Sequence, residues 1–285
     1  MFVLWYRCAQ SSKPGKLPMQ FASLPDGRTI ACVNPYEVDF SVHEIFAEDL
    51  AVHGLSLAAD STVLDVGANI GLFALYVRDH CPQGRVVAFE PMPEAFAALA
   101  HNMAAMSPPG VAVQLALGAK PGWADFDYFP GVSALSTQDH ALGERMAGGL
   151  RALLAGGQAA PVQDILDKTG ATEVATDTAF VDQLLRPQVV RAEIDTVSAQ
   201  LAKLGLDSVD LLKIDTEGAE SEVLAGLAEA DWPKIRQLLV EAHHGEDAAR
   251  QLEENLRGRG YKTQLARHPL CQPGAEVFHI YAARP

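Results

Sequence analysis

The sequence predicts an α/β protein built on a doubly wound, mostly parallel sheet. From Thr62 to Glu241, apolar strand patterns alternate with helix patterns, which is typical of a parallel sheet covered by helices. The runs 209–214 and 238–240 are almost continuously apolar, as expected of strands that are buried on both faces. A glycine-bearing turn at 67–71 joins an apolar strand to a helix. Such turns lie at the edge of a parallel sheet where ligands bind.

Residues 1–57 are expected to form an N-terminal extension made of a hairpin and a helix. The segments 21–24 and 29–33 flank the turn sequence Pro25-Asp26-Gly27. The stretch from Val38 to His53 then places its apolar residues on about one face of a helix. His43 and Glu44 in this helix are candidates for contact with a ligand, and a solvated helix face is the alternative.

Residues 58–285 form the predicted core. In chain order we expect a strand at 63–66, a helix at 72–78, a strand at 86–89, a helix at 93–106, strands at 111–117 and 210–214, a helix at 220–228, a strand at 237–241 and a helix at 247–257. The segments 261–263 and 277–282 predict an antiparallel pair that closes the sheet.

Residues 131–190 interrupt this core. They are rich in Ala, Gly, Gln and Asp and contain a helix-like run at 142–154. Because this insertion follows the third strand, it is predicted to fold as a lid over the carboxyl ends of the strands. A linker with some helix is the alternative.

Composition limits the partners of the chain. Of its 285 residues 48% are hydrophobic, and its net charge of -14 argues against a broad surface for nucleic acid. The four cysteines include no C-x-x-C pair, so a disulfide framework or a zinc ribbon is not indicated, and a reducing cytoplasm is expected. The apolar residues 1–6 are too few for a signal peptide or a membrane span, so no membrane association is expected.

The glycine turn predicts a cofactor pocket. Gly67 and Gly71 allow the backbone to turn sharply and to approach a ligand, and the first amides of the following helix are expected to offer hydrogen-bond donors. Asn69 stands where a third glycine would be expected. It suits that position because Asn enters the left-handed backbone region more readily than most residues.

Charge predicts what the pocket holds. Asp65 precedes the first glycine and should repel a pyrophosphate but attract the amino group of S-adenosylmethionine. Glu90 ends the next strand, at about 20 residues from the glycines, where a carboxylate accepts hydrogen bonds from a ribose. A nicotinamide cofactor and an ordinary turn whose acids cap helices are the alternatives.

A second set of polar residues follows two later strands. Asp215 and Glu217 end one strand, and Glu241 and His243 end the next, so they are expected to converge. His243 or Asp215 could remove the proton of a hydroxyl group that accepts a methyl group. The set could instead hold Mg²⁺, and the alternative for Asp215 is a helix N-cap. His101 and His244 are interpreted as surface or packing residues.

Several motifs together indicate a family. They lie at 63–73, at 89–93 and, most distinctively, at 211–220, with supporting pieces at 24–27, 44–46, 129–136, 223–226 and 232–235. In these motifs the chain resembles the FkbM-type methyltransferases, which are S-adenosylmethionine-dependent enzymes that mostly methylate hydroxyl groups. The resemblance spans roughly residues 24–284 and implies a Rossmann-like class I methyltransferase fold.

The resemblance also implies the site. The cofactor residues are expected to be Asp65, Gly67, Ala68, Asn69, Gly71, Glu90, Pro91, Met92, Leu117, Asp215 and Glu217, and the catalytic residues Asp215, Glu241 and His243. The flanking pieces are most similar to domains of polyketide and peptide assembly lines, which implies O-methylation of a natural-product intermediate, either free or tethered to a carrier protein. The sequence Glu217-Gly218-Ala219-Glu220 differs from the sequence that is common at this place in those assembly-line domains. The rivals are a non-catalytic nucleoside-binding module, an O-methyltransferase for a sugar or another small metabolite, and a nicotinamide-dependent oxidoreductase.

Overall fold

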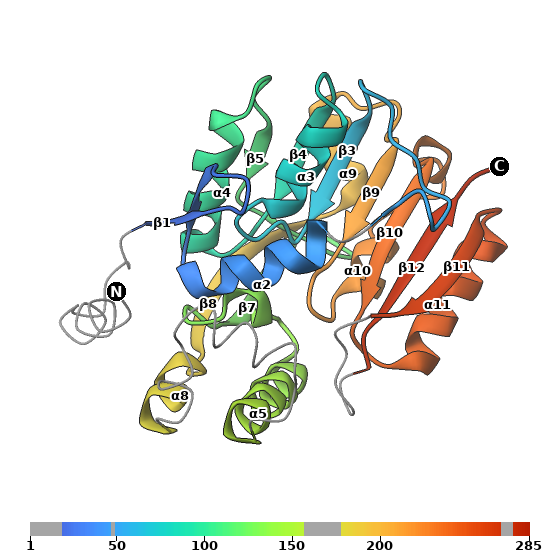
Figure 1. Cartoon of the computed structure of the whole chain (residues 1–285). Coiled ribbons are helices and arrows are strands. Elements are labelled where there is room, and N and C mark those ends of the chain that lie inside the picture. The colour runs from blue at the N-terminus through green and yellow to red at the C-terminus, as the bar shows by residue number, and fades with distance from the viewer. Residues whose placement is uncertain (1–18, 47–48, 157–177, 269–275) are drawn as a thin grey trace.

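The fold was analysed in a computed structural model that describes residues 19–46, 49–156, 178–268 and 276–285. Its centre is a seven-stranded sheet with the order β11-β12-β10-β9-β3-β4-β5 (Figure 1). These strands span Lys262–Arg267, Phe278–Ala283, Gln237–Ala242, Leu211–Ile214, Thr62–Val66, Arg85–Phe89 and Val111–Val113, respectively. The strands from β10 to β5 pair in parallel, and β12 runs antiparallel to both β10 and β11. The order of the strands confirms the predicted class I methyltransferase fold and the antiparallel closing pair.

Helices cover both faces of the sheet, and alternate strand residues pack against the two layers. Leu64 and Val66 of β3 belong to the core beneath α9 and α11, whereas Val63 belongs to the core beneath α3 and α4. These helices span Val197–Leu204, Glu246–Gly258, Leu72–His80 and Pro93–Ala105, respectively. All four residues of β9 are buried, as expected of a central strand, and three of them are apolar. Within the described residues, no helix is long and apolar enough to span a membrane.

The N-terminal hairpin is confirmed, but the helix after it is shorter than expected. Strands β1 (Gln20–Ser23) and β2 (Thr29–Cys32) pair antiparallel. Helix α2 spans Pro35–Phe46, so the prediction of a helix up to His53 is wrong. Residues 49–54 form hydrogen-bonded turns instead. The remaining short helices are α10 at Glu220–Ala225 and the 3-10 turn η2 at Trp232–Lys234.

A second, three-stranded sheet was not predicted. Its order is β6-β8-β7, with bounds Ala116–Leu117, Gln188–Asp195 and Gly122–Tyr128. The expected single strand at 111–117 is therefore wrong: the chain leaves the main sheet after Val113 and pairs again in the small sheet. The insertion contains η1 (Ser133–Leu135), α5 (His140–Gly156) and α8 (Thr178–Leu184) and runs into β8. The two helices lie below the small sheet in the view of Figure 1.

The turn at Gly67 provides a test of how closely the strands meet. A Cβ atom at Gly67, where φ is +78°, would lie 1.7 Å from the carbonyl oxygen of Asp215. The substitution Gly67→Ala should therefore force β3 and β9 apart and lower the free energy of unfolding by about 3 kcal/mol or more, as measured by urea denaturation. The control is Gly205→Ala, where φ is +62° and nothing lies within 4 Å. It should cost only about 1–2 kcal/mol, and equal losses in both variants would contradict the role of the close contact.

Candidate functional site

The glycine turn adopts the left-handed conformations that its sequence predicts. Asn69 has φ of 48°, and Gly67 and Gly71 have φ of 78° and 91°. The amides of the turn itself are bonded within the protein, because Gly67 and Ala68 donate to the carbonyl of Phe89 and Asn69 donates to Glu90. The turn is therefore anchored to the neighbouring strand β4, and side chains rather than these amides are left to contact a ligand.

A pocket opens beside this turn at the carboxyl ends of β3, β4 and β9. It encloses about 710 Å³, including the space at its mouth. Its walls are formed by Val66, Gly67, Asn69, Glu90, Pro91, Met92, Leu115, Ala116, Leu117, Phe126, Ser133, Ala134, Ser136, Gln138, Asp215, Thr216, Glu217 and Ala219. Of the predicted cofactor residues, only Asp65, Ala68 and Gly71 are outside this lining. They shape the turn, and their contact with a ligand stays a prediction.

The pocket is anionic at one side and apolar at the other. Glu90, Asp215 and Glu217 line it, and the lining contains no lysine, arginine or histidine. Met92 and Leu117 contribute apolar surface. Because no cation balances the carboxylates from within the lining, the pocket disfavours phosphate groups and favours hydroxyl groups and positive charge.

Glu90 holds the turn and faces the pocket. Its Oε2 accepts a hydrogen bond from the amide of Asn69 at 2.9 Å, and its Oε1 accepts one from the amide of Met92 at 2.8 Å. Burial raises the pKa of Glu90 to about 7, although the two amide hydrogen bonds oppose this. The ionised carboxylate, with its remaining lone pairs, therefore predominates only above about pH 7.

Asp65 lies beneath the pocket and is paired with a lysine that sequence reasoning did not select. Its side chain is 0% exposed, and the Nζ atom of Lys213 lies 3.6 Å from Asp65 Oδ1 and 3.0 Å from Asp215 Oδ2. Burial raises the pKa of Asp65, and the charge of Lys213 opposes that rise. The carboxylates that line the pocket are those of Glu90, Asp215 and Glu217, and Asp65 is not among them.

The predicted second set converges around one imidazole. His243 Nε2 lies 3.1 Å from Glu217 Oε2 and 3.5 Å from Glu241 Oε1. Its Nδ1 lies 3.1 Å from Glu220 Oε1, on a side chain that was not selected from the sequence. Atoms of Asp215, Glu241 and His243 also lie within 4.8 Å of one another. We call Glu217, Glu220, Glu241 and His243 the carboxylate–histidine cluster.

Burial and mutual charge set the protonation of this cluster. Burial alone would lower the pKa of His243, but the charges of Glu217 and Glu220 hold it well above 6.5, so the imidazole is charged. Burial raises the pKa of Glu217 well above 4.5, and the nearby carboxylates add to this effect. For Glu241, hydrogen bonds from His243 and His279 outweigh burial and hold the pKa well below 4.5.

The loop after β9 positions these groups. Glu217 has φ of 51°, and Gly218 follows with φ of 105°. The amide of Gly218 donates to Glu220 Oε1 at 2.8 Å. Helix α10 begins only at Glu220 and has Ala219 as its N-cap, so the alternative of Asp215 as a helix cap is wrong. A non-glycine residue in the left-handed region marks a strained loop, which is common at functional sites.

The insertion and the N-terminal helix reach the same site. The hydroxyl of Ser133 lies 2.7 Å from Glu37 Oε2 and 3.0 Å from Asn69 Oδ1. Burial raises the pKa of Glu37 to about 8. The hydroxyl of Thr137 donates to the carbonyl of Glu217. Glu37, Ser133 and Thr137 were not selected from the sequence, because a lone Glu, Ser or Thr outside a strand-end motif carries no signal of its own.

His101 and His244, which the sequence indicates as surface or packing residues, make different contacts. His101 packs edge-on against Phe21, as expected of a packing residue. The Nε2 atom of His244 lies 2.8 Å from the carbonyl oxygen of Gly218, so His244 supports the loop after β9. Glu44 is not on a purely solvated face, because its Oε1 lies 2.6 Å from Nε2 of His268.

Comparison with known proteins relates the chain to one family. The model for the methyltransferase FkbM domain matches residues 65–263. The chain is 35% identical over 265 residues to the 31-O-demethyl-FK506 methyltransferase FkbM of Streptomyces tacrolimicus. This alignment covers 92% of this chain and 95% of that protein. It is 33% identical over 272 residues to the AMB antimetabolite synthetase AmbE of Pseudomonas aeruginosa, covering 92% of this chain but only 12% of that protein.

A crystal structure is also similar. Methyltransferase FkbM from Methylobacillus flagellatus superposes with a TM-score of 0.48 and 13% sequence identity, and the match covers 80% of this chain and 44% of that chain.

The buried lysine provides a test of the electrostatics beneath the pocket. The substitution Lys213→Met leaves Asp65 and Asp215 without their shared cation and should lower the free energy of unfolding by about 3 kcal/mol in urea denaturation. A second change, Asp65→Asn, should restore part of this loss. The matched control is Lys234→Met, because the more exposed Lys234 pairs with Asp231 and should contribute less than about 1 kcal/mol. Equal effects at Lys213 and Lys234 would contradict this account.

Proposed function

The chain belongs to the FkbM methyltransferase family, and we propose that it uses S-adenosylmethionine to methylate a hydroxyl group of a natural-product intermediate. The observation that carries this proposal is the anionic pocket beside the glycine turn, which contains three carboxylates and no basic side chain. A dinucleotide would bring its pyrophosphate into this field, whereas S-adenosylmethionine brings a ribose, an ammonium group and a sulfonium.

The side chains of the pocket fit that cofactor. Glu90 would accept hydrogen bonds from the ribose hydroxyls, and Met92 and Leu117 would offer apolar surface to the adenine. Asp215 and Glu217 face the positively charged part. When bound, the cofactor supplies a methyl group on a sulfonium, which is an electrophilic carbon.

Glu217 is the group best placed to take the proton of the acceptor hydroxyl. It is the member of the carboxylate–histidine cluster that also lines the pocket. Its raised pKa makes it a better base than an ordinary carboxylate. His243 is charged and Asp215 is bound to Lys213, so neither has the free basicity that the sequence alone had indicated. His243 and Glu220 instead position Glu217.

The relatives support a class of acceptor. One relative is named for a substrate that lacks an O-methyl group, and the present chain corresponds to almost all of it. Another is a synthetase in which the matched part is a small fraction. These relatives support O-methylation in natural-product biosynthesis, on a free molecule or on one carried by a synthetase. Ser133, Ala134, Ser136 and Gln138 line the pocket, which supports the insertion as the lid that covers the acceptor.

The role of Glu90 makes a prediction about cofactor affinity and pH. The substitution Glu90→Ala removes the acceptor for the ribose and should weaken binding of S-adenosylhomocysteine by about 1.5–3 kcal/mol in isothermal calorimetry. In the wild type, protonation of Glu90 below its pKa of about 7 removes the same acceptor. Affinity should therefore fall as pH decreases, by about tenfold between pH 8 and pH 6.

Two controls separate this effect from others. Glu222→Ala removes an exposed carboxylate and should leave the affinity unchanged. Glu90→Ala should lose most of the pH dependence of the wild type. A pH profile that is the same with and without Glu90 would exclude it as the titrating group, and binding of NADH in place of S-adenosylhomocysteine would favour an oxidoreductase.

Methyl transfer itself tests the function. Tag-free protein is incubated with methyl-labelled S-adenosylmethionine and with hydroxylated small molecules or hydroxyacyl groups on a carrier protein, and mass spectrometry detects the label. Glu217→Gln should lower kcat by about 100-fold to 10,000-fold, because it removes the base. The same variant should keep its affinity for S-adenosylhomocysteine, which lacks the sulfonium charge. An unchanged kcat would exclude Glu217 as the base, and binding without transfer to any acceptor would favour the non-catalytic module.

A further inference from the structure

Three potential metal ligands share one face at the edge of the main sheet. Glu241 of β10 and His279 of β12 are directly opposite each other in the antiparallel register. His279 is also opposite Ala266 of β11. His268 follows two residues later, with its amide bonded to the carbonyl of Val277. Because side chains alternate along strands, this register places all three on the same face.

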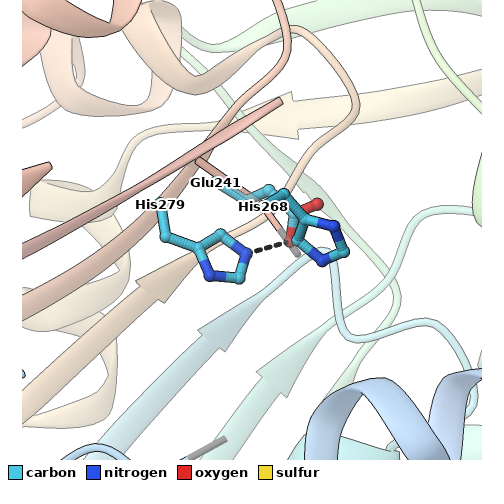
Figure 2. Close-up of side chains that lie close together, drawn as sticks. All are labelled: Glu241, His268 and His279. Carbon is cyan, nitrogen blue, oxygen red and sulfur yellow. Dashed lines mark hydrogen bonds and ion pairs between the residues drawn. The ribbon is translucent and has the colours of Figure 1, made fainter. Parts of the chain in front are cut away.

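The side chains converge, as Figure 2 shows: the two imidazoles lie on either side of the carboxylate. The Nε2 atom of His279 lies 3.3 Å from Glu241 Oε2. The centroids of the His268 and His279 rings are 4.8 Å apart, in an edge-to-face arrangement. One potential ligand atom from each residue lies within 4.8 Å of the others. Both histidines are 7% exposed. The three donors are therefore preassembled and largely shielded from water.

We propose that Glu241, His268 and His279 bind a divalent transition-metal ion. Two imidazole nitrogens and one carboxylate oxygen favour ions such as Zn²⁺ or Fe²⁺ over Mg²⁺, which prefers oxygen ligands. Bonds of about 2.0–2.2 Å to a tetrahedral ion require donors about 3.3 Å apart, which Glu241 and His279 already satisfy. Three protein ligands leave a further position on the ion for water or another ligand.

The surroundings of the two histidines match those of metal-bound imidazoles. Such imidazoles usually have a hydrogen-bond partner on the nitrogen that does not bind the ion, and this partner fixes the ring. The hydroxyl of Tyr281 lies 3.0 Å from Nδ1 of His279, so Nε2 is left to face Glu241. Glu44 of α2 lies 2.6 Å from Nε2 of His268. With Glu241, the carboxylate of Glu44 balances the charge of a divalent cation.

This set is distinct from the predicted Mg²⁺ set of Asp215, Glu241 and His243. Both nitrogens of His243 already face carboxylates, and Asp215 is bound to Lys213. Glu241 belongs to both sets, with Oε1 toward His243 and Oε2 toward His279. An ion at the new site would tie β10, β12, the end of β11 and, through Glu44, helix α2 together beside the pocket.

Metal binding tests the site without an activity assay. Tag-free full-length protein is titrated with Zn²⁺ by calorimetry and with Co²⁺ by visible absorption. Removing the hydrogen-bond partner of a metal-binding residue typically weakens metal affinity about 10-fold to 100-fold. Tyr281→Phe, which removes such a partner, should therefore weaken Zn²⁺ binding about 10-fold. His268→Gln and His279→Gln, which remove metal-binding imidazoles, should weaken it more than about 100-fold. His101→Gln, on the exposed face of α4, and Asp215→Asn should bind as the wild type does. Zn²⁺ should raise the Tm of the wild type but not of His279→Gln.

A measurement on the wild type covers the case in which the variants do not fold. Pulsed electron paramagnetic resonance of the Cu²⁺-loaded protein should show two coupled imidazoles. One imidazole, or loss of binding in Asp215→Asn with binding kept in His268→Gln, would place the ion in the other set and overturn the proposal. Absence of Zn²⁺ binding at micromolar concentration would also overturn it. None of these outcomes depends on whether S-adenosylhomocysteine binds.

Discussion

The close contact between the backbone of Gly67 and the carbonyl of Asp215 is the constraint on which the rest of the site depends. The amide of Asp215 donates to the carbonyl of Val66, so the glycine turn and the loop after β9 leave the sheet side by side. This contact places the pocket and the carboxylate–histidine cluster within reach of each other. It also brings two strand-end acids together, and Lys213 beneath them supplies the cation that makes their burial tolerable.

Sequence patterns predicted the parts of the fold that local chemistry determines. Strands β3, β4, β9 and β10 are mostly apolar, and the pocket lies at carboxyl ends that the parallel topology brings together. The small sheet was missed because its strands carry weak sequence signals. Strand β6 has only two residues, and β8 has charged residues at alternate positions near its end, so neither forms an apolar run that predicts a buried strand. Likewise, Glu37 and Ser133 reach the pocket only through tertiary contacts between segments far apart in the chain.

The same limit applies to the choice of a base. A histidine after a strand is a reasonable base when it is considered alone, because its ordinary pKa lies near neutrality. In the folded protein, however, three carboxylates surround His243, and their charges hold the pKa of its imidazole well above that value. One of these neighbours, Glu217, becomes more basic because it is buried among other acids. The pKa of each group is therefore a property of the cluster, which sequence spacing does not encode.

The charge argument for the ligand depends on which acids line the pocket. Asp65 was expected to meet the cofactor, but it is buried and paired with Lys213. The carboxylates that face the pocket are those of Glu90, Asp215 and Glu217. Lys213 pairs with Asp65 and Asp215 but is not among the residues that line the pocket, so its charge is not presented by the lining. A glycine turn alone is compatible with either a dinucleotide or a sulfonium cofactor, and it is this separation of the buried cation from the ligand-facing anions that favours the sulfonium.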